Sequence, residues 1–185
     1  LVDTVRPFTI NRAGTLAYTT ATRFLGFQVS DIATGRVLYT VRGFGVRFPY
    51  DPATFSPSAP SHGISLSPDE KELYVLDAPN SHLHVFDVSS VPVAPPRQVA
   101  DIKLRSMAGE EVGCLYDCER DGWVQHSRDG RFVFVGDSGD VIDTATRAVV
   151  VNLEPLRNTR KHLEITWQDG MPIATSTRSG VGYVR

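Results

Sequence analysis

Basic side chains recur at one position relative to the polar turns of this 185-residue sequence. The residues five positions before the four turns are Arg6, His62, Gly122 and His162. Imidazole and guanidinium groups form charge-assisted hydrogen bonds to carboxylates, phosphates and polarised carbonyls. If these positions meet in space, His62, His162 and Arg6 would form a site for an anionic or carbonyl-bearing ligand. Contact with channel water alone is the alternative role for such residues.

Carboxylates that could complete this site lie in the segment 105–121, RSMAGEEVGCLYDCERD. Glu111 or Asp117 could serve there as the general base that moves a proton. A carboxylate beside His62 and His162 would also give a set of metal ligands. The chain has no G-x-S-x-G elbow, P-loop or H-E-x-x-H motif. We therefore assign no metal, and the sequence leaves the cofactor undetermined.

The two cysteines, Cys114 and Cys118, lie in the same segment. A structural zinc site needs four ligands, and no second cysteine or histidine pair accompanies this one. The spacing favours a local disulfide formed in an oxidising compartment, with two free thiols as the alternative.

The turns belong to a repeat that recurs along the chain, and they read NRAG, SPDE, SRDG and WQDG. The runs that follow, such as KELYVLD and RFVFVGD, alternate at the period of a half-buried strand. A third strand follows each hairpin, and a fourth completes the first three repeats. On one of the third strands His82 and His84 alternate with apolar residues, so we expect both on its solvent-facing side. No segment has a helical period of convincing length.

Four antiparallel strands repeated at a spacing of about 40 residues are typical of β-propeller blades. We expect an all-β fold, a single propeller domain over 1–185 with about four blades of four-stranded antiparallel sheet. The blades are expected at 6–43, 61–104, 122–153 and 162–184, with insertions at 44–60 and 105–121. Because chain direction alternates between strands, both insertions should share one face with the starts of the innermost strands. This face is the channel mouth, where the basic residues should lie.

The second and third repeats carry a family resemblance. HGISLSPDEKELYV and SRDGRFVFVGDSGDVIDTATRAVVV resemble the YVTN-type β-propeller repeat family, also called lactonase-like or surface-layer-type propellers. The YVTN signature itself appears in altered form, as YVLD and FVGD. The resemblance implies about seven blades, which would make this chain the C-terminal portion of a larger propeller. It also implies an extracytoplasmic location, either periplasmic, secreted or at the cell surface.

The two ends of the sequence pose a question of ring closure. Residues 1–5, LVDTV, have the pattern of an outer strand, and the fourth repeat ends after three strands. Residues 1–5 would either close a four-bladed ring by pairing with the last blade or finish a preceding blade. The seven blades of the resemblance favour the second alternative, and the start at Leu1 is expected of a processed or excised piece. Open sheet edges would then invite the remaining blades or a second copy.

Composition argues against two classes of partner. The formal net charge of −2 and the pI of about 6.2 give no attraction to nucleic acid or anionic lipid. No run approaches the roughly 20 apolar residues of a membrane span.

Two hypotheses for function follow. The first is a scaffold that binds a small molecule or a protein partner on the insertion-bearing face. The alternative is a lactonase-type hydrolase or lyase, in which His62, His162 and Arg6 polarise a carbonyl. Convergence of both histidines with a carboxylate in one pocket would support the enzyme. An exposed apolar face built from the aromatic residues of 44–55 would support partner binding.

Overall fold

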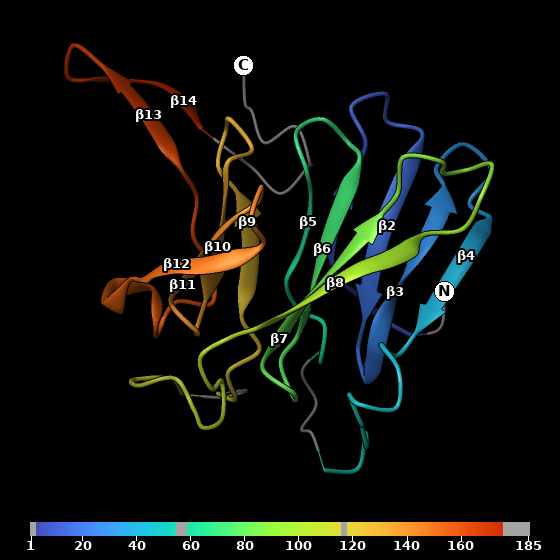
Figure 1. Ribbon diagram of the computed structural model, residues 1–185, viewed down its shortest axis with the longest axis horizontal. Helices are drawn as coiled ribbons and strands as arrows, with labels where there is room; N and C mark the ends of the chain where they lie inside the picture. The colour runs from blue at the N-terminus through green and yellow to red at the C-terminus, as the bar shows by residue number, and fades with distance from the viewer. Residues whose placement is uncertain (1–2, 55–58, 116–117, 176–185) are drawn as a thin grey trace.

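The computed structural model describes residues 3–54, 59–115 and 118–175. In these ranges the chain forms fourteen β-strands and one short 3-10 helix, η1 (Glu154–Leu156). The strands form three four-stranded sheets and one two-stranded sheet, arranged one after another across the molecule (Figure 1). The expected all-β fold is confirmed. No helix in the described part of the chain has the length and apolarity to cross a membrane.

Strands that follow one another in sequence are neighbours in each sheet, as in a propeller blade. The first sheet contains β1 (Val5–Ile10), β2 (Leu16–Ala21), β3 (Phe24–Asp31) and β4 (Val37–Arg42). The second contains β5 (Ile64–Leu66), β6 (Glu72–Asp77), β7 (His82–Asp87) and β8 (Arg97–Lys103). The third contains β9 (Trp123–His126), β10 (Phe132–Gly136), β11 (Asp140–Asp143) and β12 (Ala148–Asn152). The last described sheet contains β13 (Ile165–Gln168) and β14 (Met171–Thr175).

The first hairpins of the second and third sheets are closed by the same side-chain hydrogen bonds. The Ser67 hydroxyl donates to Asp69 Oδ1 at 2.7 Å and accepts the backbone N–H of Glu72 at 3.0 Å. Ser127 and Asp129 repeat the turn one sheet later. Such side chains stabilise turns because they satisfy backbone groups that the ladder leaves unpaired. The SPDE and SRDG turns therefore help to fix the register of the flanking strands.

Two apolar clusters join the sheets face to face. Between the first and second sheets, Phe27 and Phe86 meet edge to face with ring centroids 4.9 Å apart. Between the second and third sheets, the cluster includes Leu76, Val124 and Val133. Burial of one such side chain contributes roughly 1.5–3 kcal/mol. These clusters therefore supply much of the cohesion between sheets.

The first strands of successive sheets lie close together. β5 contacts both β1 and β9, and a Cβ added at Gly63 would lie only 2.5 Å from Val124 Cγ2. Only glycine permits so close an approach of two strands. The contact brings His62 to Gly122, where the imidazole Nδ1–H donates to the backbone carbonyl at 2.8 Å.

The expectation for the chain start needs correction, because Thr4 and Val5 pair with β2. The Thr4 carbonyl accepts the N–H of Thr22 at 3.0 Å, and Val5 pairs with Ala21. These residues thus continue the first strand of the first sheet and are not an outer strand of another blade. At the other end, the third strand expected within 162–184 lies outside the described residues.

The solvent-facing position expected for His84 is wrong. The imidazole is fully buried, with Nδ1 2.8 Å from Asp101 Oδ1 and Nε2 3.2 Å from Asp77 Oδ2. Phe44, which follows β4, covers this side of the second sheet and stacks on the His84 ring at 4.0 Å between centroids. Phe44 and Phe48 are both buried, so they do not form the exposed apolar face considered above.

Gly63→Ala tests the approach of β5 to β9. The added methyl collides with Val124, and such overpacking costs about 1–3 kcal/mol of unfolding free energy. Urea denaturation measures the loss. Gly35→Ala is the control: nothing lies within 4 Å of its added Cβ, and φ is +69°, so this change carries backbone strain alone. A loss in Gly63→Ala smaller than that in Gly35→Ala would contradict the close strand contact.

Candidate functional site

Both insertions leave the sheets at the same end of the molecule, the lower edge in Figure 1. The first hairpin turns of the second and third sheets lie at the opposite end. A cavity of about 520 Å³ lies between the two insertions. Tyr50 and Asp51 line it from the first insertion, and Met107, Glu119 and Arg120 line it from the second. We call this cavity the cleft; its volume falls within the range of small-molecule sites.

The first wall of the cleft is held by aromatic packing on the second sheet. Phe44 stacks on His84, and Phe48 meets the same ring edge-on at 4.5 Å between centroids. Asn80 Nδ2 donates to the Pro49 carbonyl at 3.1 Å. This wall is therefore attached to the sheet mainly through apolar surface.

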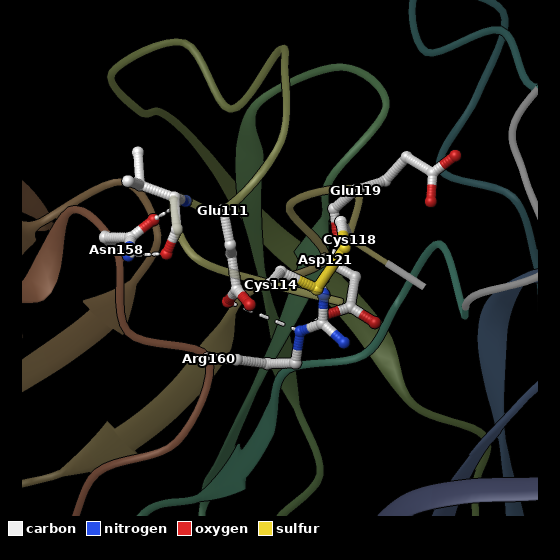
Figure 2. Close-up of a disulfide and its surroundings, with 8 residues drawn as sticks. Glu111, Cys114, Cys118, Glu119, Asp121, Asn158 and Arg160 are labelled. Atoms are coloured by element: carbon white, nitrogen blue, oxygen red, sulfur yellow. Dashed lines mark hydrogen bonds and ion pairs between the residues drawn. A yellow bond between two sulfur atoms is a disulfide. The ribbon is translucent and has the colours of Figure 1, made fainter. Parts of the chain in front are cut away.

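The second wall is held by Arg160, from the connection between η1 and β13. Its Nε lies 2.9 Å from Asp121 Oδ1 and 3.4 Å from Glu111 Oε1 (Figure 2). Its Nη2 donates to the Glu119 carbonyl at 2.9 Å. His62 Nδ1 lies 3.6 Å from the same Asp121 oxygen. Because the Asp121 side chain is only 1% exposed, its charge depends on these partners.

A disulfide and an asparagine hold the remainder of this wall. Cys114 and Cys118 form the disulfide expected from their spacing (Figure 2), and the Cys118 carbonyl accepts the N–H of Glu111 at 2.9 Å. Asn158 bonds both backbone groups of Val112, at 2.7 Å and 3.1 Å. The connection after η1 thus pins the insertion at two places.

Asp137, directly after β10, is buried within this cluster. Its backbone has a left-handed φ of 63°, and its Oδ2 accepts the N–H of Gly122 at 3.0 Å. Burial raises the pKa of Asp137 to about 7, and the negative charges of Glu111 and Asp121 add to the increase. This carboxyl therefore holds its proton far above the usual pH range.

Two of the five residues expected at the channel mouth, His62 and Glu111, lie in this cluster. Arg6 lies at the start of β1, where its Nε donates to Thr22 Oγ1 at 2.8 Å. Asp117 lies outside the described residues. No group of three or more histidine, cysteine or acidic side chains in the described ranges is arranged to hold a metal ion.

His162 lies in a separate cavity of about 340 Å³ at the third sheet, lined with Leu153 and Leu156. Its ring meets Phe134 edge-on at 6.4 Å between centroids. Burial lowers the pKa of His162 to about 4, so the imidazole is neutral at pH 7. The β13–β14 hairpin points away from the other sheets (Figure 1). His162 therefore does not reach the cluster that holds His62.

Sequence reasoning missed Asp121 and Asp137, and it gave Arg160 no defined role. One signal was present: Asp137 ends RFVFVGD as Asp77 ends KELYVLD. Both aspartates are almost fully buried, and both lie beneath an insertion. A polar residue at the end of an otherwise apolar strand pattern is the feature that could have indicated them.

No protein-family model and no curated protein sequence matches this chain. Solved structures do match. Hydrazine synthase of Kuenenia stuttgartiensis aligns with a TM-score of 0.54 and 19% identity over 77% of this chain and 33% of its own. The WD40 repeats of RRP9 align with a TM-score of 0.53 and 12% identity over 83% of this chain and 39% of their own. A putative 6-phosphogluconolactonase from Bacteroides fragilis aligns with a TM-score of 0.54 and 16% identity over 83% of this chain and 40% of its own.

These similarities show the fold class, which is a β-propeller. The described residues form three four-stranded blades and a two-stranded sheet. The chain spans between one third and two fifths of the length of these neighbours. At such low identities the neighbours carry information on the fold alone.

Arg160→Met tests the ion pairs of the second wall. It leaves the buried Asp121 charge without its guanidinium, so we expect a loss of about 3 kcal/mol of unfolding free energy at pH 7.5 by urea denaturation. Arg97→Met is the matched control, because Arg97 pairs with Asp87 on the surface at 73% side-chain exposure; it should lose less than about 1 kcal/mol. Equal losses would show that the cluster is not desolvated.

Proposed function

We propose that this chain is a non-catalytic β-propeller scaffold that binds a small molecule or a peptide segment of a partner in the cleft. The observation that carries the proposal is the cleft itself, formed between two insertions with separate anchors, the first on the second sheet and the second on the connection after η1. Binding residues are often found on loops that a rigid framework positions. Its walls combine the apolar surface of Tyr50 and Met107 with the charges of Asp51, Glu119 and Arg120. An amphipathic ligand that carries a charged group suits such walls.

The lactonase or lyase alternative has less support. It needs His62, His162 and Arg6 around one carbonyl. However, His62 donates to the Gly122 carbonyl and Arg6 donates to Thr22. His162 lies in a separate cavity beside leucine side chains. The putative 6-phosphogluconolactonase among the structural neighbours shares the fold at 16% identity. This similarity keeps the enzyme as the second candidate.

Membership of the YVTN-type family and a ring of about seven blades also belong to the proposal. The lengths of the structural neighbours support such a ring, because this chain covers 33–40% of each of them. The disulfide supports an extracytoplasmic location, since such bonds persist in oxidising compartments.

The cleft can be tested by saturation-transfer NMR with a library of carboxylate-bearing aromatic fragments. We expect fragments that bind the wild-type chain to lose most of their signal with Arg120→Ala, which removes a charged side chain from the cleft wall. Arg36→Ala, on an exposed turn outside the cleft, should leave the signal unchanged. Binding that survives both substitutions equally would place the ligand elsewhere, and turnover of a lactone by the wild-type chain would favour the enzyme.

A second partner surface is the β13–β14 hairpin, for which we propose another propeller blade as the occupant. Trp167 is 60% exposed, and Ile165, Met171 and Ile173 are exposed beside it. The two closed interfaces between sheets are made of similar apolar faces. In the isolated chain, the first blade of a second copy would supply the occupant.

Light scattering across micromolar concentrations tests this surface. The isolated chain should associate as its concentration rises, and Trp167→Ser should weaken the association several-fold. Val93→Ser changes another exposed apolar residue, at 92% exposure between β7 and β8, and should have no effect. A chain that stays monomeric, or an association indifferent to Trp167, would contradict the proposal.

A further inference from the structure

The cluster beneath the second wall contains more negative than positive charge. Among the described residues, the carboxyl groups of Glu111 and Asp121 pair with the guanidinium of Arg160, and the carboxyl group of Asp137 lies beside both of them. Protonation of His62 would still leave one carboxylate in excess. Asp121 and Asp137 are each only 1% exposed. An excess negative charge at such burial is costly, and a carboxyl group in this position keeps a proton instead.

The surroundings of Asp137 indicate which pair of groups would hold that proton. The carboxyl groups of Asp137 and Glu111 are within hydrogen-bonding reach of each other. Each has one buried oxygen without a donor, Asp137 Oδ1 and Glu111 Oε1, although the latter lies 3.4 Å from the Arg160 guanidinium. Two acceptors side by side repel unless one of them carries a hydrogen. A proton shared by this pair supplies the missing donor.

Other charged groups near this turn have different partners. Asp140 accepts the N–H of Arg105 and an N–H of Asn152. Arg157 donates to the side chain of Asn152. Arg120, on the same insertion, directs its Nη1 to the Ala108 carbonyl at 3.4 Å. The groups that face the Asp137–Glu111 pair are therefore Asp121 and, beside Glu111, Arg160, with His62 beyond Asp121.

Glu111 is also part of the framework that shapes the cleft. Its N–H bonds the Cys118 carbonyl, and the Arg120 N–H bonds the Gly109 carbonyl at 3.2 Å. Glu119, which forms an isolated β-bridge with Glu110, and Arg120 line the cleft. A force that separates Glu111 from Asp137 therefore moves a cleft wall away from the third sheet.

We propose that this insertion is a proton-dependent latch. One proton shared between Asp137 and Glu111 holds the disulfide-bridged loop on the third sheet, and loss of that proton loosens the loop and opens the cleft wall. The consequence for binding rests on the proposed function of the cleft, whereas the loosening of the loop does not.

The direction of the pH effect follows from linkage. The pKa of Asp137 is about 7 with the loop in place and near 4 once the group is in water. The contribution of the proton to holding the loop is complete below pH 4, declines as pH rises, and is lost above pH 7. His126, held neutral by burial with its pKa lowered to about 3, acts on global stability with the opposite sign. A local measurement is therefore needed.

Hydrogen–deuterium exchange between pH 5 and 8, corrected for intrinsic exchange rates, provides that measurement. In the wild-type chain, protection of peptides from 108–115 and 118–122 should fall at least about tenfold from pH 5 to 7 and then level off. Asp137→Asn cannot ionise and keeps an oxygen for the Gly122 N–H, so its protection should change less than about twofold. Glu111→Gln removes the neighbouring negative charge but leaves Asp137 able to ionise, so it should reduce the decline, and it serves if Asp137→Asn folds poorly. Asp143→Asn, on an exposed turn at the other end of the molecule, should keep the wild-type profile.

Three outcomes are decisive. A pH-independent wild-type loop, or a pH dependence that persists unchanged in both variants, overturns the latch. A wild-type decline that Asp137→Asn abolishes or Glu111→Gln reduces supports it. The fragment measurement, repeated at pH 5.5 and 7.5, separates the two proposals. A loop whose protection depends on pH, with no ligand bound in the cleft, supports the latch and contradicts the scaffold. Ligand binding in the cleft with a pH-independent loop supports the scaffold and contradicts the latch.

Discussion

A buried aspartate at the end of the second strand is the constraint on which the insertion-bearing face depends. Asp77 ends β6 and Asp137 follows β10, and neither is more than 1% exposed. A carboxyl group so far from water must gather hydrogen-bond donors or keep a proton. Asp77 accepts a hydrogen bond from the Asn80 side chain and lies 3.2 Å from His84 Nε2. Asp137 accepts the N–H of Gly122, and its carboxyl group is within hydrogen-bonding reach of Glu111.

The side chains around each of these two aspartates hold one of the insertions in place. His84, fixed by Asp77, presents the ring against which Phe44 and Phe48 pack. The cluster around Asp137 holds the second insertion through Arg160. An excess of carboxylates around one guanidinium responds strongly to pH. The first wall of the cleft is therefore attached by ring packing on His84, and the attachment of the second depends on the proton proposed for Asp137 and Glu111.

The sequence predicted what depends on local patterns. Alternating runs and Ser-Asp turns predicted the strands, the blades and the shared face of the insertions, and the cysteine spacing predicted the disulfide. It did not predict contacts that depend on how distant segments pack. Arg160 meets Asp121 only because the connection after η1 folds back on the preceding insertion. His84 is buried because Phe44 covers a strand face that its alternation marks as polar.

The placement of His162 has a similar cause. Equal spacing before each turn suggested a common axis for Arg6, His62 and His162, and this inference assumed that every blade packs alike. β5 and β9 do pack in this way, at Gly63, and they bring His62 to Gly122. The β13–β14 hairpin points away, so His162 remains with Phe134. Spacing thus indicated equivalent positions in the repeat, and tertiary packing decided which of them meet.

The most direct test of the buried carboxylate is a pH titration of the Asp137 carboxyl carbon by ¹³C NMR, with the resonance assigned by its absence in Asp137→Asn. The buried Asp137 carboxyl should remain protonated through pH 5 and titrate with a midpoint near 7. A midpoint near 4, the ordinary value for a solvated aspartate, would contradict it.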